Sequence, residues 1–257
     1  MTGVAAAGSQ RRGLLVPSLA VAASLAVLML LGLWQLDRKA WKEGLIATLK
    51  QRLAAAPIAL PQPVDWPLLT AETDEFLRVA MTAEFLNDRE ALVYTGGGST
   101  LREASSGPGY WIFTPARLEG GALVMVNRGF VPDGKQDPLA RPEGQVAGPI
   151  KMVGALRWPE KPGLFTPAGD PARNIWFARQ SDAIAAAKGI SSAPFYVELE
   201  SPQPPGGLPH ADRLRPNLPN NHFGYALTWF GLAAVLLGFY AAGLFGGWWK
   251  RDVEHRA

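Results

Sequence analysis

Two long stretches without a charged side chain constrain the fold of this chain more than any other feature. Residues 13–36 and 223–249 form uncharged runs of 24 and 27 residues. About 20 apolar residues cross a hydrocarbon core of about 30 Å as a helix, and a helix satisfies its own backbone polar groups. The sequence therefore predicts two transmembrane helices with a long segment between them.

The first uncharged run has to be weighed against a cleaved signal peptide, because Arg11 and Arg12 precede it like a basic leader. Leaders usually have an apolar stretch of roughly 7–15 residues and a small-residue cleavage site, whereas this run is longer and lacks such a site before Trp34. We therefore expect an uncleaved anchor. The expected division is a tail at 1–12, helices at 13–36 and 222–249, an amphipathic extension at 37–56, a β domain at 57–200, a proline-rich connector at 201–221 and a tail at 250–257.

The net charge of +3 lies in the two tails. Arg11 and Arg12 belong to the first tail, the last tail is also basic, and residues 37–222 hold equal numbers of basic and acidic side chains. A nucleic-acid partner requires a basic field, so that class of protein is excluded. Basic tails favour the cytoplasmic side, so we expect a bacterial inner-membrane protein with cytoplasmic termini and a periplasmic central domain.

Proline content indicates the architecture of the central segment. Of 22 prolines, 21 lie between residues 57 and 219, a density that a helix bundle does not tolerate. Short apolar runs bounded by Gly or Pro predict strands at 75–85, with a break in alternation, and at 91–94, 110–113, 123–127, 150–156 and 195–198. A short helix is expected at 181–188, capped by Ser181. The fold class is an integral membrane protein with two transmembrane α-helices flanking a mostly β (α+β) domain.

Catalytic and metal-binding motifs are missing from the sequence. The chain has no cysteine and three histidines, without the spacing of a zinc site or the Gly-x-Ser-x-Gly elbow of a hydrolase. We therefore expect no enzymatic activity.

The start of the second apolar run is chemically distinctive. At 100° per residue, one helix face carries His222, Tyr225, Ala226, Trp229 and Ala233. An imidazole followed by aromatic and small side chains suits a flat apolar ring that carries a metal, and haem is such a molecule. The alternative is a histidine that hydrogen-bonds water and headgroups within an aromatic belt. The residues alone leave both interpretations open.

Two adjacent faces of the first helix carry aromatic and polar side chains: Trp34, Arg38 and Trp41 on one, Gln35, Lys39 and Lys42 on the other. Arg38 lies where a carboxylate of a bound ring would leave the membrane, and arginine binds carboxylates bidentately. Arg128, expected just after a strand, offers the same chemistry. The alternatives are an interfacial belt with snorkelling cations and, for Arg128, a structural turn.

The chain resembles the Surfeit-locus family of cytochrome c oxidase assembly factors, called Shy proteins in yeast. The resemblance rests on blocks spread over nearly the whole sequence: Gly32, Trp34-Gln35, Arg38, Trp41-Lys42 and Leu45-Ile46; Gly109-Tyr110, Thr114-Pro115 and Val126-Asn127-Arg128-Gly129 with Val131-Pro132; Gly154, Arg157, Glu160, Pro162, Asn174 and Trp176; and Asn220-Asn221-His222, Tyr225-Ala226 and Thr228-Trp229. Two positions depart from the family pattern, Phe130 for the usual Trp and Gly169-Asp170 for an Asn-Asp-like pair.

The resemblance implies a role in maturing the haem-bearing core subunit of cytochrome c oxidase. Bacterial members are linked to haem a, and His222 matches the motif histidine proposed as its axial ligand. With haem as the ligand, we hypothesise from the helix faces that Tyr225, Trp229 and Trp34 wall the ring and that Arg38 and Arg128 receive propionates. The implied partners are the oxidase core subunit, haem a synthase and the lipid bilayer. The alternative function is a cofactor-free scaffold for the unassembled core subunit.

Overall fold

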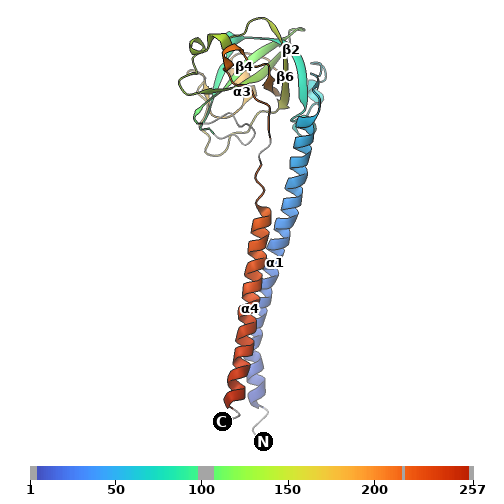
Figure 1. Ribbon diagram of the computed structural model, residues 1–257, viewed down its shortest axis with the longest axis vertical. Helices are drawn as coiled ribbons and strands as arrows, with labels where there is room; N and C mark the ends of the chain where they lie inside the picture. Colours follow the sequence, from blue (N-terminus) through green and yellow to red (C-terminus); the bar gives the residue numbers. More distant parts are fainter. Residues whose placement is uncertain (1–4, 98–106, 216–217, 255–257) are drawn as a thin grey trace. The chain divides into compact units, whose positions relative to one another are not determined.

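The computed structural model describes residues 5–97, 107–215 and 218–254, with side chains of the membrane helices described from residue 15 to residue 244. The predicted basic tails therefore lie outside the described side chains. Two compact units are present: a helix pair formed by residues 1–45 and 219–257, and a β domain formed by residues 46–218. The fold class expected from the sequence is confirmed (Figure 1).

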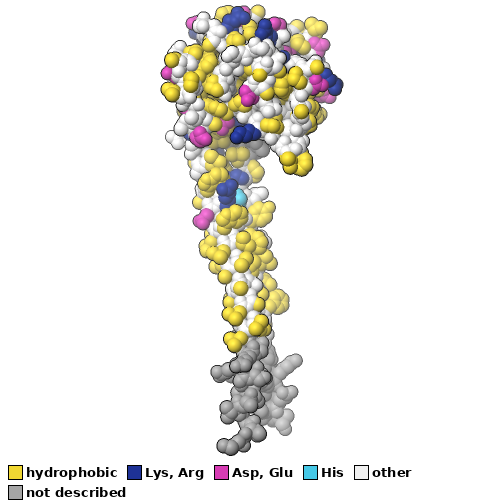
Figure 2. All heavy atoms as spheres, turned by 180° about the vertical axis from the view of Figure 1, so that it is seen from behind, with side chains coloured by type: hydrophobic (Ala, Val, Ile, Leu, Met, Phe, Trp, Pro, Cys, Tyr) yellow, Lys and Arg dark blue, Asp and Glu magenta, His cyan; other side chains and the backbone are white. Residues whose placement is uncertain are grey.

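The helix pair consists of α1 (Ala5–Ala54) and α4 (His222–Glu254), which lie side by side (Figure 1). Both are long and apolar enough to cross a membrane, over Leu15–Ala54 and His222–Leu244. Hydrophobic side chains cover the described part of this unit in Figure 2, and Lys and Arg side chains gather at one end of the apolar band. These features are those of two membrane-spanning helices.

The two helices pack along a seam in which less exposed positions alternate every three and four residues. These positions recur at 21, 25, 28, 32, 35, 39 and 42 on α1, and at 222, 226, 229, 233, 236 and 240 on α4. A mean spacing of 3.5 residues is typical of left-handed helix packing. Small residues allow close approach: a Cβ added to Gly32 would lie 2.3 Å from the Phe230 ring, and Ala226 and Ala233 are buried.

The β domain is a closed barrel of five strands. Its strands are β2 (Arg78–Phe85), β4 (Gly109–Leu118), β5 (Leu123–Pro132), β6 (Pro149–Arg157) and β8 (Tyr196–Ser201). The order β2-β6-β8-β5-β4 closes through β2–β4 pairing, and only β5–β8 is parallel. Outside the barrel, β1 (Ile58–Ala59) pairs with β2, while β3 (Ala91–Thr95) pairs with β4 and β7 (Ile175–Trp176).

Strand alternation sends side chains into two apolar clusters. All five barrel strands contribute to the first cluster, which includes Val79, Val126, Met152 and Val197 and therefore fills the barrel interior. The second cluster combines the outer face of β4, β5 and β8 with β3, β7 and α3 (Ser181–Ala187). Because both faces of these strands are buried, their sequences read as continuous apolar runs.

A β-bulge interrupts the pairing of β4 with β5. Trp111 pairs with Phe130 and Phe113 pairs with Asn127, so Arg128 and Gly129 together face a single residue of β4. Bulges change the direction of side chains and often lie near functional sites. Here the extra residue leaves Arg128 on the interior face, in contact with the interior residue Phe85, and brings Phe130 into the outer cluster.

The proline-rich segment after β8 packs on the β domain before it reaches α4. His210 and Phe130 exchange two backbone hydrogen bonds of 2.8 and 3.0 Å, and Ala211 and Leu214 are buried. The sequence predicts a stiff, extended connector over residues 201–221 that leads from the domain to the membrane. The structure differs because backbone pairing at the bulge and burial of these two apolar side chains hold residues 202–214 against the barrel.

The six predicted strands, both spans, the helical extension of the first span and the short helix near 181–188 are present in the described residues, with two local differences. The break in alternation near Phe76 is a left-handed residue (φ 67°) that precedes β2, so no bulge is needed there. The proposed cap at Ser181 is wrong: Gln180 occupies the cap position without a side-chain bond, and its carbonyl accepts from Ile184 N–H. The two-residue strands β1 and β7 were too short to show alternation.

Candidate functional site

His222 begins α4 and hydrogen-bonds across the helix pair to Gln35 of α1. The distance between His222 Nδ1 and Gln35 Oε1 is 2.7 Å. An amide oxygen only accepts, so Nδ1 is the donor in this pair, and in the neutral imidazole Nε2 then keeps its lone pair. A histidine held through one ring nitrogen and unprotonated at the other is prepared to bind a metal.

Two further contacts hold the chain where it enters α4. Lys42 Nζ donates to the carbonyl of Pro219 over 2.5 Å, and Asn220 Nδ2 donates to the carbonyl of Lys39 over 3.4 Å. Lys39 and Lys42, the α1 residues in these two bonds, lie at seam positions on the same face of α1 as Gln35. Lys39 and Lys42, for which the sequence offered only snorkelling as an alternative, therefore hold Pro219 and Asn220 just before His222.

The aromatic side chains proposed as ring walls lie mostly on the outside of the helix pair. Trp34 and Tyr225 are 56% and 57% exposed, whereas Trp229 lies half-buried on the seam. Arg38 is exposed and its guanidinium carbon lies 3.9 Å from the Trp41 ring centre. The single predicted face of α4 is thus divided: His222, Ala226 and Trp229 follow the seam, and Tyr225 faces outward.

Arg128 belongs to the β domain and not to the helix pair. The sequence placed it after a strand, whereas it lies within β5 at the bulge and is only 2% exposed. Its guanidinium donates to Asn87 Oδ1 over 3.0 Å and to the carbonyl of Gly144. Desolvation lowers the pKa of Arg128 to about 10, an effect that Glu90 opposes and Arg141 reinforces.

Gln35 is the residue of the candidate site that the sequence analysis missed. It was grouped with Lys39 and Lys42, although its signal was present in the spacing of Gly32, Gln35, Lys39 and Lys42, which repeats every three and four residues. A polar residue on such a stripe faces the partner helix. Gln35 is 9% exposed, so its amide requires a partner, and His222 supplies it.

The geometry of the helix pair suits one metal ligand with flanking aromatic surface. Within the described residues, no group of three or more His, Asp or Glu side chains is arranged to hold a bare metal ion. A metal bound through His222 would need its remaining ligands from the molecule that carries it, as the ring nitrogens of a haem supply them. The residues present therefore fit a haem better than a free ion.

The architecture and the His222–Gln35 pair define a class of protein: a membrane protein with two spans, a closed β barrel between them, and a histidine at the start of the second span. The SURF1 family model matches residues 22–234, which include the whole barrel and part of each membrane helix. The chain belongs to the SURF1 family, which confirms the Surfeit-locus resemblance.

Similarity to individual proteins extends over most of the chain. A SURF1-like protein of Monosiga brevicollis is 36% identical over 219 residues, covering 82% of this chain and 80% of the relative. Surfeit locus protein 1 of Rattus norvegicus is 34% identical over 215 residues, or 80% of this chain and 68% of its own. The Homo sapiens protein of that name is 32% identical over 214 residues, or 80% and 70%.

Proposed function

We propose that this protein is an assembly factor for haem–copper (cytochrome c) oxidase that binds haem a and assists its insertion into the core subunit. The observation that carries the proposal is the His222–Gln35 hydrogen bond of 2.7 Å. It holds one ring nitrogen and leaves the other to coordinate iron at the boundary of a span. Family membership supports the wider role, because the Surfeit-locus resemblance implies oxidase assembly.

In this proposal each residue of the helix pair has a separate task. His222 supplies the axial nitrogen, and Gln35 fixes its tautomer and orientation. Trp34, Tyr225 and Trp229 provide apolar surface for the macrocycle, since flat aromatic side chains bury large areas. Arg38 receives a propionate, for which a guanidinium is well suited. The role is binding and transfer, without covalent chemistry by the protein.

The proposed location is a bacterial inner membrane, with both termini in the cytoplasm and the β domain in the periplasm. Basic residues in both tails support this orientation,. The proposed partners are the oxidase core subunit, which accepts the haem, and haem a synthase, which supplies it. The two spans would hold this protein in the same lipid bilayer as the core subunit and the synthase, so the three proteins could meet there.

Absorbance of the purified chain after co-expression with haem a synthesis tests the proposal. We expect a haem a spectrum from the native chain, nearly complete loss with His222→Ala, and a reduced yield with Arg38→Gln. His210→Ala is the matched control, because His210 belongs to the β domain, and it should keep the haem.

The rival function is a cofactor-free scaffold that stabilises the unassembled core subunit. It predicts a colourless preparation that still co-purifies with that subunit. It also predicts that His222→Ala supports oxidase assembly as well as the native chain does. Either result would overturn the haem proposal.

A further inference from the structure

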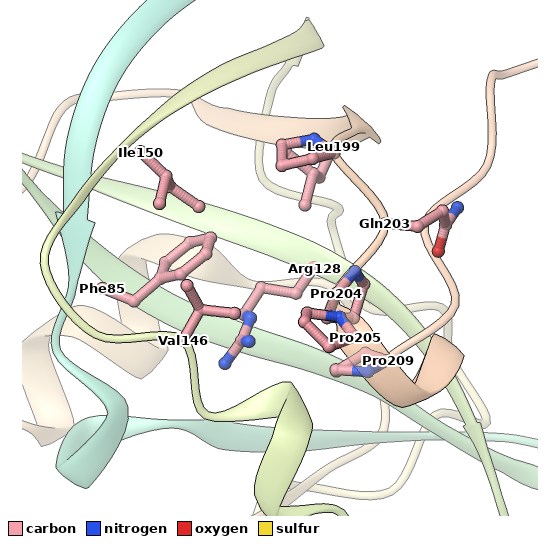
Figure 3. A pocket seen from close by; sticks show the side chains of 10 residues that line it. Phe85, Arg128, Val146, Ile150, Leu199, Gln203, Pro204, Pro205 and Pro209 are labelled. Atoms are coloured by element: carbon pink, nitrogen blue, oxygen red, sulfur yellow. The ribbon is translucent and has the colours of Figure 1, made fainter.

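One end of the barrel holds an apolar pocket with a volume of about 240 Å³. Phe85, Ile150 and Leu199 line it from β2, β6 and β8, and prolines of residues 202–209 cover it (Figure 3). Figure 3 shows Arg128 among these side chains, with Phe85 and Val146 on one side and Pro204, Pro205 and Pro209 on the other. The pocket thus lies at one end of the barrel interior, and the proline segment covers that end.

Arg128 is the polar group that this pocket offers to a ligand. The other polar side chain in the lining, Gln203, is already bonded on both sides of its amide to the backbone of Ala211. Arg128 uses two of the five N–H groups of a guanidinium, on Asn87 and Gly144. The other three have no protein acceptor in the described part of the chain.

Arg128 forms no ion pair of its own within the described residues, unlike the buried Arg141 and Arg157, and Glu90, whose charge acts on it, is paired with Arg141. Arg141 forms an ion pair with Glu90, and Arg157 forms one with Glu75 over 3.0 Å. Arg128 instead contacts two neutral acceptors and the Phe85 ring, whose centre lies 4.4 Å from its guanidinium carbon. A buried charge without a direct ion-pair partner is costly, and perturbed charged groups in pockets mark functional sites.

The backbone around Arg128 is arranged to keep the pocket as it is. The bulge requires Gly129 at φ 122°, where an added Cβ would lie 2.1 Å from the carbonyl oxygen of His210. That close approach lets His210 pair with Phe130 and fixes the proline segment over the barrel end. Gly129 and Phe130 of β5 therefore form the bulge beside Arg128 and also hold the proline segment over the barrel end.

We propose that this pocket binds an apolar small molecule through a terminal carboxylate held by Arg128. Charge complementarity selects an anion, the apolar walls select a hydrocarbon body, and the planar guanidinium matches a carboxylate bidentately. The volume is below the range of about 300–1,000 Å³ of most ligand pockets, so it accepts a short molecule or one end of a longer one. A fatty acid and the propionate arm of a haem are two sources of this chemistry.

Photolabelling of the full chain in lipid nanodiscs tests the proposal. The probe is a fatty acid with a diazirine on its alkyl chain, and the matched control probe is the corresponding alcohol. Mass spectrometry of the digested protein locates the label. We expect the acid to label residues around Phe85, Ile150 and 202–209 at least about tenfold more than the alcohol, the loss expected for a hydrogen bond to a charged group. Equal labelling by the two probes, or labelling elsewhere, would overturn the proposal.

Two variants and one control keep the result interpretable. Arg128→Met removes the charge, and Val146→Phe fills the pocket while keeping Arg128, so a folding defect of the first leaves the second as a test. Both should lower labelling by about tenfold. Arg117→Met removes an exposed arginine of β4 and should leave labelling unchanged. Undiminished labelling in a folded Arg128→Met chain would contradict the role of the cation.

Competition identifies the source of the carboxylate. Unlabelled decanoate and unlabelled haem are added separately: displacement by decanoate alone assigns a fatty acid, and displacement by haem as well assigns the propionate arm. Displacement by neither contradicts the site. The proposal does not depend on iron ligation by His222, and His222→Ala should leave labelling unchanged, so the two proposals can fail independently.

Discussion

The helix pair and the β domain bury polar side chains in different ways. In the β domain, buried charges come as pairs, such as Arg141 with Glu90 and Arg157 with Glu75. In the helix pair, the polar contact at the start of α4 is between two side chains that can both be neutral, Gln35 and His222. Charges are costly in a hydrocarbon layer, whereas an aqueous-phase domain tolerates them when they are paired.

This difference shows where to look for function in each region. In the domain the candidate is Arg128, a buried cation at the bulge that forms no ion pair within the described residues. In the helix pair the exception is an imidazole with one nitrogen unused, and a glutamine positions it. In both regions the functional candidate is a polar group with donor or acceptor capacity that no described residue uses.

The largest expected effect comes from Gly129→Ala, which disrupts the β-bulge next to Arg128. The new Cβ would meet the backbone of His210 at 2.1 Å, at a φ that side chains rarely adopt. Strain and loss of the Phe130–His210 pairing should lower the free energy of unfolding by about 4 kcal/mol or more. Urea unfolding followed by near-ultraviolet circular dichroism measures this.

Gly120→Ala is the control for that substitution, because an added Cβ there meets nothing within 4 Å. It should change the free energy of unfolding by less than about 0.5 kcal/mol. Equal effects of the two substitutions would show that the bulge does not depend on glycine.

The second effect compares a buried ion pair with an exposed one. Glu90→Gln leaves Arg141 buried without its carboxylate, and we expect a loss of about 3 kcal/mol in the free energy of unfolding. Glu43→Gln breaks the exposed Lys39–Glu43 contact of α1 and should cost at most about 0.5 kcal/mol. Denaturant midpoints of both variants in detergent measure the ratio, and similar losses would contradict the contrast between the two regions.

The third effect separates stability from binding in the helix pair. Gln35→Leu removes one polar contact between membrane helices, which should cost only about 0.6 kcal/mol. The orientation of His222 is lost with it, so haem a retained after purification should fall several-fold, a far larger effect than the change in stability. Gln35→Glu, which keeps an acceptor for Nδ1–H, should restore part of the haem content. Unchanged haem content in Gln35→Leu would remove Gln35 from the site.

Much of the fold was readable from the sequence because local patterns carry it. The uncharged runs gave both spans, and apolar runs between Gly and Pro gave six of the eight strands. The closure of the barrel was not readable, because it depends on β2 pairing with β4 over only three residue pairs, Ala83 to Phe85. Long-range pairing of this kind leaves no periodic signal in either strand.

The candidate site was readable in part. His222 was found from its position at a span boundary, whereas its partner Gln35 lies 187 residues away and can be found only once the seam is known. Arg128 was singled out for its chemistry, but its location inside β5 depends on a bulge that one glycine permits. The positions of these side chains are therefore set by contacts between elements and not by the segments that contain them.

The smallest expected effect at neutral pH concerns Tyr196, a polar group that the β domain buries without a partner. Its hydroxyl has no hydrogen-bond partner in the described part of the structure, and desolvation raises the pKa of Tyr196 well above its ordinary value of 10. Tyr196→Phe should therefore change stability at pH 7 by less than about 1 kcal/mol, and in the stabilising direction.

Alkaline pH magnifies this effect, and its sign is fixed. Above pH 10 the unfolded chain loses the tyrosine proton while the folded chain keeps it, so the unfolded state binds fewer protons and stability falls as pH rises. One group contributes at most about 1.4 kcal/mol per pH unit. The difference between Tyr196→Phe and the native chain should therefore be small and constant from pH 7 to 9 and grow above pH 10. A difference that stays constant to pH 11 in urea titrations would show that the hydroxyl is not held protonated, and that the domain satisfies this group as fully as it does its paired charges.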